Sequence, residues 1–267
     1  MRKVKSIITL LTDFGNDDWY VASMKGVIKS INPDAEIVDI THNIKSHSIS
    51  DGAFVLYNTY SYYPEKTIFV AVVDPGVGSS RKMILLKTTK HFFIAPDNGL
   101  LTYIVKYNSK YEAIGIENKK YFLPDVSSTF HGRDIFSPIA AYLSKDYKIE
   151  KFGKKIRRLT MLDIEDAKIE KNAITAPIIY IDKFGNLIIN IKKSEFSKVL
   201  KLKEIKNKTG KEILACQTPL KSSYADVDEG EVVAYWGSSQ FLEIGINQAS
   251  AAKRFNLKVG DVIKLKI

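Results

Sequence analysis

Short runs of β-branched and aliphatic residues alternate with helical patterns in the first half of the chain. Five runs predict strands, at 6–11, 36–40, 67–73, 83–87 and 91–95. Apolar residues at helical spacing from 21 to 31 predict a helix that Asp17 or Asp18 caps and Pro33 ends, and a second helix is predicted over 48–60. This alternation is typical of a mainly parallel sheet with helices on both faces.

The pattern changes after about residue 145. The segment 145–170 is charged and weakly periodic, and the runs after it predict short strands without long helices between them. These runs lie at 173–181, 187–191, 201–205, 212–215, 231–235, 241–246 and 261–267. Short strands between Gly, Asn and Asp turns favour a β-barrel or sandwich. The sequence therefore predicts the α/β class, with an α/β domain over 1–150, a linker over 151–170 and a smaller all-β barrel domain over 171–267.

Composition narrows the class of protein further. The chain has 267 residues, 45% of them hydrophobic and 26% charged, which is typical of a globular protein that needs no metal or disulfide for stability. Its longest apolar runs, at 68–73 and 178–181, are far shorter than the ~20 residues that cross a bilayer, so we expect no membrane contact. The apolar stretch near Met1 is too short for a secretion signal. The single cysteine, Cys216, cannot pair within the chain, and we expect a cytoplasmic protein.

The formal net charge of +10 is an excess that can attract nucleic acids. Lysines at 145–171 and 192–211 are nevertheless interleaved with Glu and Asp, without the aromatic and basic pattern of a base-stacking surface. We expect a solvated surface and no nucleic-acid partner, and a basic nucleic-acid-binding protein is the less favoured alternative. Arginine is rare beside lysine, so Arg81 and Arg133, in turns rich in Gly and Asp, indicate a need for a planar, permanently charged donor.

Polar residues follow apolar strands abruptly where Asp13, Asp74 and Asp97 stand at predicted carboxyl ends. Each is also typical of an ordinary turn. Because ligands of parallel sheets bind at the carboxyl ends of strands, three such turns at one edge favour a functional site. Gly76 and Gly78 lack the spacing of a phosphate-binding loop, since a strand rather than a helix is predicted to follow them.

The run 127–134 concentrates hydroxyls, an imidazole, a guanidinium and a carboxylate before an apolar helix predicted over 135–143. Two interpretations stay open. Either His131 takes part in catalysis, or Asp134 is the N-cap of the helix and His131 is a hydrogen-bonded loop residue. In the second half, the segment 182–186 joins an acid and an aromatic residue to the Gly and Asn of an ordinary hairpin turn.

Six motifs occur in order along nearly the whole chain. They are LTDFG at 11–15 with YVASMKG at 20–26, DITH at 39–42, VDPGVGSSR at 73–81, PDNGL at 96–100, TFHGRD at 129–134 and DKFGN at 182–186. Together they resemble the S-adenosyl-L-methionine (SAM) hydroxide adenosyltransferases, SAM hydrolases related to fluorinating and chlorinating enzymes. The resemblance implies an N-terminal α/β domain, a C-terminal β-barrel and a homotrimer with active sites between one subunit's first domain and its neighbour's second. It also implies a reaction without cofactor or metal, in which water and SAM give adenosine and L-methionine.

The resemblance also implies roles for residues. In this family an Asp, an Arg and a His handle the water, and the matching residues are Asp74, Arg81 and His131. Halogenating relatives carry a Tyr and Thr halide pocket instead, so the set favours hydroxide. Asp13 matches the residue that binds the ribose hydroxyls, to which a carboxylate is suited as an acceptor. Since methionine leaves a sulfonium without needing a proton, the enzyme mainly has to orient and activate one water for in-line attack at C5′.

Further substrate contacts are implied for the second half. The resemblance gives Asp182 to the methionine ammonium, Ser238 to the methionine carboxylate, Asn186 and Asn247 to adenine, and Phe184 to packing nearby. The chain departs from the halogenating relatives in having Tyr20 in place of a serine and Ser239 in place of an arginine.

A rival hypothesis makes the polar residues ligands of a two-metal phosphoesterase. The candidate ligands are Asp13, His42, Asp74, Asp97, His131 and Asp134. This hypothesis predicts bound metal, whereas the resemblance predicts none. His47 and His91 do not follow a strand in this way and are interpreted as structural.

Overall fold

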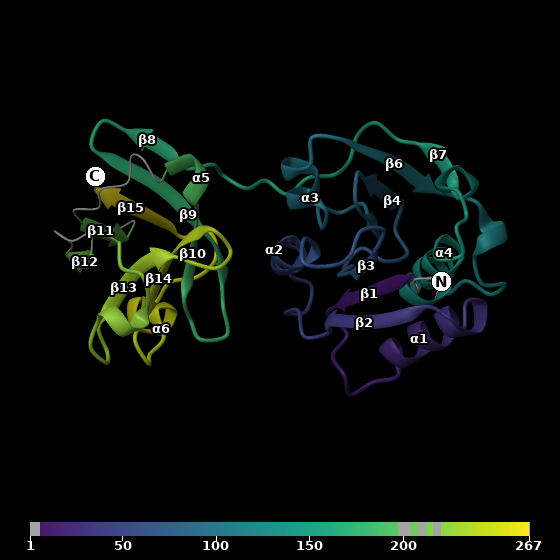
Figure 1. Cartoon of the computed structure of the whole chain (residues 1–267), viewed down its shortest axis with the longest axis horizontal. Helices are drawn as coiled ribbons and strands as arrows, with labels where there is room; N and C mark the ends of the chain where they lie inside the picture. Colours follow the sequence, from purple (N-terminus) through teal and green to yellow (C-terminus); the bar gives the residue numbers. More distant parts are fainter. Residues whose placement is uncertain (1–5, 197–203, 208–211, 216–219, 267) are drawn as a thin grey trace. The chain divides into compact units, whose positions relative to one another are not determined.

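The computed structural model describes residues 6–196, 204–207, 212–215 and 220–266. Met1, Cys216 and part of the predicted strand at 201–205 lie outside the described residues. The chain divides into two compact units, Met1–Leu162 and Asp163–Ile267 (Figure 1). Across the described ranges, none of the helices has the length and apolar character needed to span a membrane.

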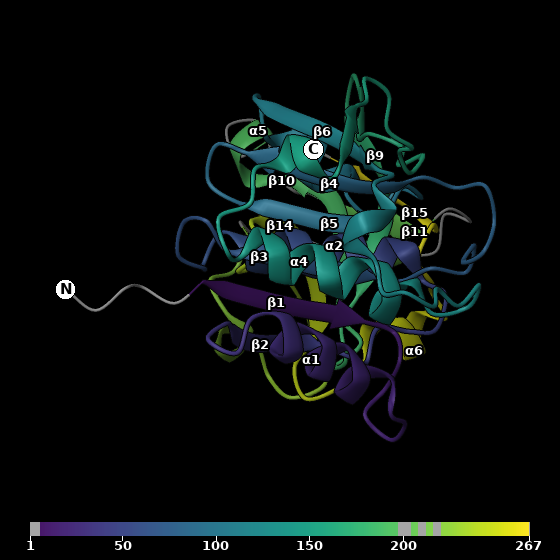
Figure 2. The same ribbon diagram turned by 90° about the vertical axis from the view of Figure 1, so that its right-hand side faces the viewer.

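The first unit is built on a single sheet. Its strands are β1 (Ile7–Thr12), β2 (Glu36–Thr41), β3 (Ile68–Val72), β4 (Met83–Thr88), β5 (Phe92–Pro96), β6 (Tyr111–Ile116) and β7 (Gly153–Lys155). They lie in the order β2-β1-β3-β5-β4-β6-β7. Figure 2 shows this order from β2 to β6. The strands β2, β1, β3 and β5 are parallel to one another. The strands β4, β6 and β7 extend the sheet with antiparallel pairing. The five strands predicted in this half are confirmed, and the parallel part brings their carboxyl ends to one edge.

Helices cover both faces of this sheet, as predicted. They are α1 (Tyr20–Ile31), α2 (Ile49–Tyr60), α3 (Thr102–Tyr107) and α4 (Ser137–Leu143), with short turns η1 (Lys119–Tyr121), η2 (Gly132–Phe136) and η3 (Ile149–Lys151). On one face of the sheet, α1 and α4 pack on the side chains of Leu10, Val70 and Ile94. On the other face α2 approaches so closely that a Cβ at Gly52 would lie 3.1 Å from Val73. Figure 1 shows α1 and α4 on one side of the sheet and α2 and α3 on the other.

Two predicted helix starts are wrong. The helix α1 begins after Trp19, and no side chain caps it. Asp17 and Asp18 therefore precede the cap, where both are exposed. The predicted helix over 135–143 begins as the π-helical turn η2, and Asp134 lies inside this turn rather than at its N-cap. The Asp134 carboxylate instead accepts hydrogen bonds from Ser127 N–H and from the neighbouring Arg133, so it is not available to the helix terminus.

The second unit is a curled antiparallel sheet, a half-barrel. Its strands are β8 (Lys168–Glu170), β9 (Ala173–Ile181), β10 (Leu187–Lys192), β11 (Glu204–Asn207), β12 (Glu212–Ala215), β13 (Val232–Trp236), β14 (Phe241–Ile246) and β15 (Val262–Lys266), with α5 (Lys193–Phe196), η4 (Tyr224–Asp226) and α6 (Ala251–Phe255) between them. The order is β12-β11-β15-β9-β10-β14-β13, and β8 pairs with β9. Its core contains Ile178, Leu187, Ala234, Leu242 and Ile244. The strand β10 is buried at nearly every position, whereas β14 places the half-buried Glu243 between the buried Leu242 and Ile244, as a strand with one core-facing side does.

Candidate active site

Three aspartates lie at the carboxyl ends of parallel strands of the first unit, as the sequence predicts. Asp13 follows β1, Asp74 follows β3 and Asp97 follows β5. Each carboxylate has a different partner. Asp13 accepts from the His47 backbone N–H at 2.8 Å, and Asp97 accepts from the Thr160 backbone N–H at 2.8 Å. Asp74 binds Arg81.

The structure brings Asp74, Arg81 and His131 together. Arg81 Nε donates to Asp74 Oδ1 at 2.7 Å, and Arg81 Nη2 donates to Asp74 Oδ2, so the pair is bidentate. Nη2 also lies 2.9 Å from His131 Nδ1. The side chains of Arg81 and Asp74 are only 8% and 4% exposed. Low exposure strengthens these charge-assisted bonds and fixes the plane of the guanidinium.

The protonation of His131 follows from its partner. Arginine can only donate, so His131 Nδ1 accepts, and the proton of the neutral ring lies on Nε2. Burial lowers the pKa of His131 and the Arg81 charge lowers it further, although Asp74 and Asp134 oppose the shift. A neutral imidazole that donates through Nε2 is therefore the form favoured near neutral pH.

One nitrogen of Arg81 is left over. Within the described part of the chain, Nη1 is buried and has no hydrogen-bond partner. A buried donor without a partner is costly, and in native structures it is usually satisfied by water, an ion or a ligand. The two N–H groups of Nη1 are therefore available to an oxygen atom that binds beside the Asp74–Arg81 pair.

A close approach of two loops supports this cluster. The loop after β3 turns through Gly78 at a φ of +81°. A Cβ at Gly78 would lie 2.6 Å from the backbone oxygen of Ser128, nearer than real contacts allow. The absence of a side chain at Gly78 thus lets the loop that carries Arg81 pack on the segment that leads to His131.

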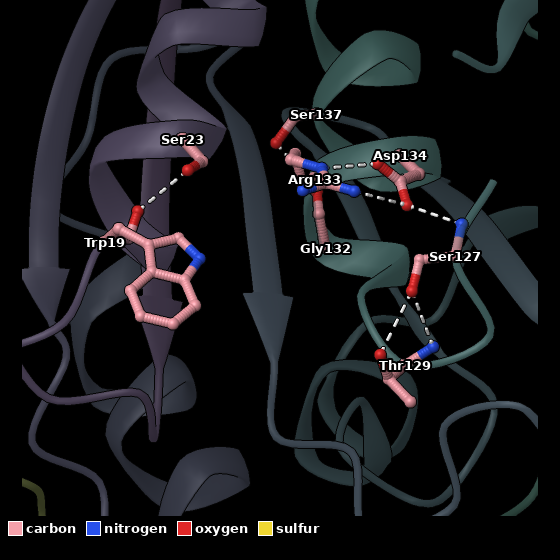
Figure 3. Close-up of polar contacts among 8 residues, drawn as sticks. All are labelled: Trp19, Ser23, Ser127, Thr129, Gly132, Arg133, Asp134 and Ser137. Atoms are coloured by element: carbon pink, nitrogen blue, oxygen red, sulfur yellow. Dashed lines mark hydrogen bonds and ion pairs between the residues drawn. The ribbon is translucent and has the colours of Figure 1, made fainter. Parts of the chain in front are cut away.

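That segment is held by Asp134, which is fully buried. Its carboxylate accepts from the Ser127 N–H at 2.8 Å and from Arg133 Nε at 2.6 Å, and Ser137 Oγ donates to the Gly132 carbonyl at 2.8 Å (Figure 3). Arg133, the second arginine that the sequence singles out, thus binds a structural carboxylate, and its guanidinium also lies 5.1 Å from the Phe130 ring. The segment is therefore a hydrogen-bonded loop, as one of the two interpretations of the sequence holds. The bonds of Asp134 in this loop position His131 beside Arg81.

The other histidines have separate surroundings. The His42 ring is buried, with Nδ1 2.8 Å from Thr12 Oγ1 and Nε2 3.1 Å from Asp39 Oδ1. Burial would raise the pKa of Asp39, but hydrogen bonds from Lys25 and His42 hold it below its ordinary value. His91 packs edge-on against aromatic rings, and burial lowers its pKa.

The proposed metal ligands do not converge. In the described ranges, no group of three or more His, Cys, Asp and Glu side chains is arranged to hold a metal ion. The carboxylates instead take backbone N–H groups or arginines, as Asp13, Asp74, Asp97 and Asp134 illustrate. This distribution does not favour the two-metal hypothesis.

In the second unit, Asp182 organises the turn between β9 and β10. Its Oδ1 accepts from the backbone N–H groups of Phe184 and Asn186, each at 2.9 Å, and its Oδ2 accepts from Asn186 Nδ2 at 2.8 Å. The carboxylate and the amide are thereby fixed side by side. Phe184 is 66% exposed at the tip of the turn.

A cavity of about 500 Å³ adjoins this turn. Phe184, Asn186, Tyr224, Ile246 and Ala249 are among the residues that line it. Its lining joins apolar and aromatic surface to a few polar groups, which is typical of a site for a small organic ligand.

The last two residues given to substrate binding lie in other loops. Ser238 is exposed in the turn between β13 and β14. The Asn247 amide donates to the Val227 carbonyl at 2.9 Å, so one of its donors holds a neighbouring loop.

Sequence reasoning missed a polar network in this unit. The hydroxyl groups of Tyr224 and Tyr235 are hydrogen-bonded to each other, and Tyr235 also donates to Glu243 Oε2 at 2.9 Å. Ser239 Oγ donates to Glu243 Oε1 at 3.1 Å. A glutamate in an otherwise apolar strand, directly opposite a tyrosine, is the signal that could have found it.

Comparisons with known proteins identify the family. Models of the SAM hydroxide adenosyltransferase N-terminal and C-terminal domains match residues 8–153 and 176–264. An (R)-S-adenosyl-L-methionine hydrolase of Methanocaldococcus jannaschii is 35% identical over 98% of this chain and 96% of its own length, and one of Thermus thermophilus is 30% identical over 97% and 98%. The crystal structure of an uncharacterized conserved protein from Thermotoga maritima, 36% identical, superposes with a TM-score of 0.90 and covers 97% of this chain and 100% of its own.

Proposed function

The chain belongs to the SAM hydroxide adenosyltransferase family, and we propose on this basis that it hydrolyses SAM to adenosine and L-methionine. The observation that carries the proposal is the Arg81 guanidinium, which Asp74 and His131 hold in place while its Nη1 has no partner in the described part of the chain. This is the arrangement that a developing hydroxide needs.

In the proposed reaction, the oxygen of one water forms a bond to C5′ while the bond from C5′ to sulfur breaks. The electron pair of that bond goes to sulfur, which becomes the neutral thioether of methionine, and one proton is released. Because the leaving group needs no acid, catalysis consists of placing the water in line and stabilising its developing negative charge. Arg81 Nη1 supplies donors for this charge.

The proton has a restricted set of acceptors. His131 Nδ1 accepts a hydrogen bond from Arg81, and the neutral ring carries its proton on Nε2, so His131 acts as a donor to the oxygen and not as its base. The proton then goes to the Asp74 carboxylate or to solvent. In this scheme Asp74 also holds Arg81, through both of its oxygens.

Substrate binding is proposed from the remaining residues. Asp13 accepts from the ribose hydroxyls, and Asp182 pairs with the methionine ammonium. Asn186 and Phe184, which line the cavity of about 500 Å³, bind the adenine. Ser238 contacts the methionine carboxylate, and Asn247 supports the adenine end.

Four further properties belong to the same proposal. The protein acts as a homotrimer, in which a neighbouring subunit helps to complete each site, without a metal, in the cytoplasm and without a nucleic-acid partner. Light scattering would test the trimer against three times the chain mass of 30.1 kDa.

The two hydrolases from Methanocaldococcus jannaschii and Thermus thermophilus are named for the (R) epimer of SAM, and we propose the same preference here. The sulfonium is pyramidal, so its two epimers direct the methionine chain differently when C5′ and the ribose are held in place. Only one of them can keep the ammonium at a fixed carboxylate.

The experiment follows both products by chromatography after incubation of the protein with epimerised SAM and EDTA. Adenosine and methionine should form in equal amounts, the (R) epimer should disappear first, and Arg81→Ala and His131→Ala should be severely slowed. Arg157→Ala, a change at an exposed arginine, is the matched control and should behave as the unchanged enzyme. Absence of adenosine would refute the proposed function. Activity that EDTA abolishes and a divalent cation restores would refute metal independence.

A further inference from the structure

The strands β13 and β14 carry two different faces. Ala234, Leu242 and Ile244 point into the core of the second unit. Tyr235 and Glu243 pair directly across the two strands and therefore share the opposite face. Tyr235 is 8% exposed, so this polar face is covered rather than solvated.

Glu243 is the centre of a network on this face. One carboxylate oxygen takes the Tyr235 hydroxyl at 2.9 Å and the other takes the Ser239 hydroxyl at 3.1 Å. Tyr235 in turn bonds Tyr224, which lines the cavity beside Asn186. The network thus joins the cavity to the turn that carries Ser238.

The backbone near Glu243 is shaped around its carboxylate. A Cβ at Gly237, the residue before Ser238, would lie 1.7 Å from Glu243 Oε1, so the carboxylate occupies the space that a side chain would take. The same turn is closed by hydrogen bonds from Gly237 N–H to Phe241 and from Gln240 N–H to Gly237. Glu243 therefore packs directly on the turn and bonds it through Ser239.

No basic residue of the described ranges pairs with the charge of Glu243. Its hydrogen bonds within the described ranges come from hydroxyl groups, and no lysine or arginine is among them. Burial raises the pKa of Glu243, and the neighbouring Asp182 charge raises it further, against the two hydrogen bonds that lower it. Such an environment favours the arrival of a cation, because a cation stabilises both carboxylates.

We propose that Glu243 is a positioning residue for the methionine end of the substrate: it fixes the turn of Ser238 and Ser239, and its charge acts with Asp182 on the ammonium. The inference rests on the proposed function for the identity of the ligand. It adds a residue that contacts neither the water nor the ribose. Its effect is therefore expected in binding and not in the chemical step.

The test compares Glu243→Gln with Glu229→Gln, which removes the same charge from an exposed residue of the same unit. Glutamine can still accept from Tyr235, so the variant removes the charge with little change of shape. Calorimetry on the full-length protein measures the affinities for methionine and for adenosine, and product formation gives kcat and KM for SAM. Glu243→Gln should weaken methionine binding and raise the KM about tenfold, with kcat and adenosine affinity nearly unchanged. Glu243→Asp, which keeps the charge, should restore part of the methionine affinity.

Two results of this comparison would overturn the inference. Equal behaviour of Glu243→Gln and Glu229→Gln would show that the charge does not act on the ligand. A parallel loss of methionine and adenosine affinity, without rescue in Glu243→Asp, would show a merely structural role. The wild-type activity assay tests the proposed function separately, since calorimetry with methionine compares the variants even if SAM is not hydrolysed.

The pH dependence provides a second readout. The titratable groups that face Glu243 are Tyr235 from β13, Tyr224 from η4 and Asp182 from the turn after β9. Burial raises the pKa values of both tyrosines, so they stay neutral through the acidic range. The methionine affinity of the unchanged protein should fall on acidification as Glu243 takes up a proton, and this component should be absent in Glu243→Gln. Identical profiles for the two proteins would count against the proposal.

Discussion

Replacing Arg81 by lysine keeps the charge and removes the planar fork. Arg81 makes two bonds to Asp74 and one to His131, and it keeps the Nη1 donors for a ligand. A lysine ammonium is a single point with three donors, and it cannot span Asp74 and His131 while also offering a donor at the position of Nη1.

The expected loss follows from the donors removed. Losing one donor to an oxygen that becomes charged in the transition state typically costs about 10²–10³ in kcat, or about 3–4 kcal/mol. We therefore expect Arg81→Lys to lower kcat for SAM at least about a hundredfold. The KM should change much less, because the Arg81 donors act on the water and not on the nucleoside.

The assay is the initial rate of adenosine formation at saturating SAM, with urea unfolding to verify that the variant is folded. The matched control is Arg133→Lys. Arg133 also grips a carboxylate with two nitrogens, Nε at 2.6 Å and Nη2 at 3.1 Å from Asp134, but its fork serves the loop. The control should lose stability but keep a kcat well above that of Arg81→Lys, because a lysine can still donate to Asp134 and the Ser127 N–H bond to that carboxylate remains. A folded Arg81→Lys variant within a few-fold of wild-type kcat would refute the argument that fork geometry matters.

Two further predictions follow from the same cluster. Gly78→Ala should destabilise the fold by about 1–3 kcal/mol in urea unfolding, because the residue has a positive φ and its new Cβ would clash with Ser128. Gly76→Ala, in the same loop, meets only an ordinary 3.5 Å contact and should be nearly neutral. Equal stabilities of the two variants would contradict the close packing at Gly78. Burial and the Arg81 charge lower the pKa of His131 below its ordinary 6.5, so kcat/KM should stay constant on acidification until the pH falls below that value. It should then drop, because protonation removes the acceptor for Arg81. A midpoint above 6.5 would contradict the assignment of His131 as a neutral donor.

Five first-unit strands, β1 to β5, could be predicted because their signal is local, whereas β6 was not predicted. Runs such as β3 are buried at every position, and the turn residues that follow them mark their ends. By contrast, β7 has three residues, intermediate to exposed, and acquires its conformation only by pairing with β6. No periodicity within three residues can reveal such a strand, because the partner that stabilises it lies far away in the sequence.

In the candidate site, too, local contacts could be predicted from the sequence and contacts that depend on distant packing could not. Asp74 and Arg81 are seven residues apart in one loop, so the sequence indicates that they are neighbours. The role of Asp134 could not be read in this way. Its position before an apolar run suggests a helix cap, but its bonds to Ser127 and Arg133 turn the chain into a π-helical turn instead. The choice between these partners depends on how the preceding loop packs.

The protonation state of His131 shows why contacts matter more than residue types in this site. An Asp, an Arg and a His suggest a relay in which histidine is the base. The contact between Arg81 Nη2 and His131 Nδ1 excludes that use of Nδ1, since a guanidinium has no lone pair to offer and its hydrogen must point at the ring. Histidine then orients the arginine on one side as Asp74 does on the other. Asp74 and His131 therefore fix the position of one guanidinium, and the chemistry of the cluster depends on the N–H donors of Arg81 that they leave unbound.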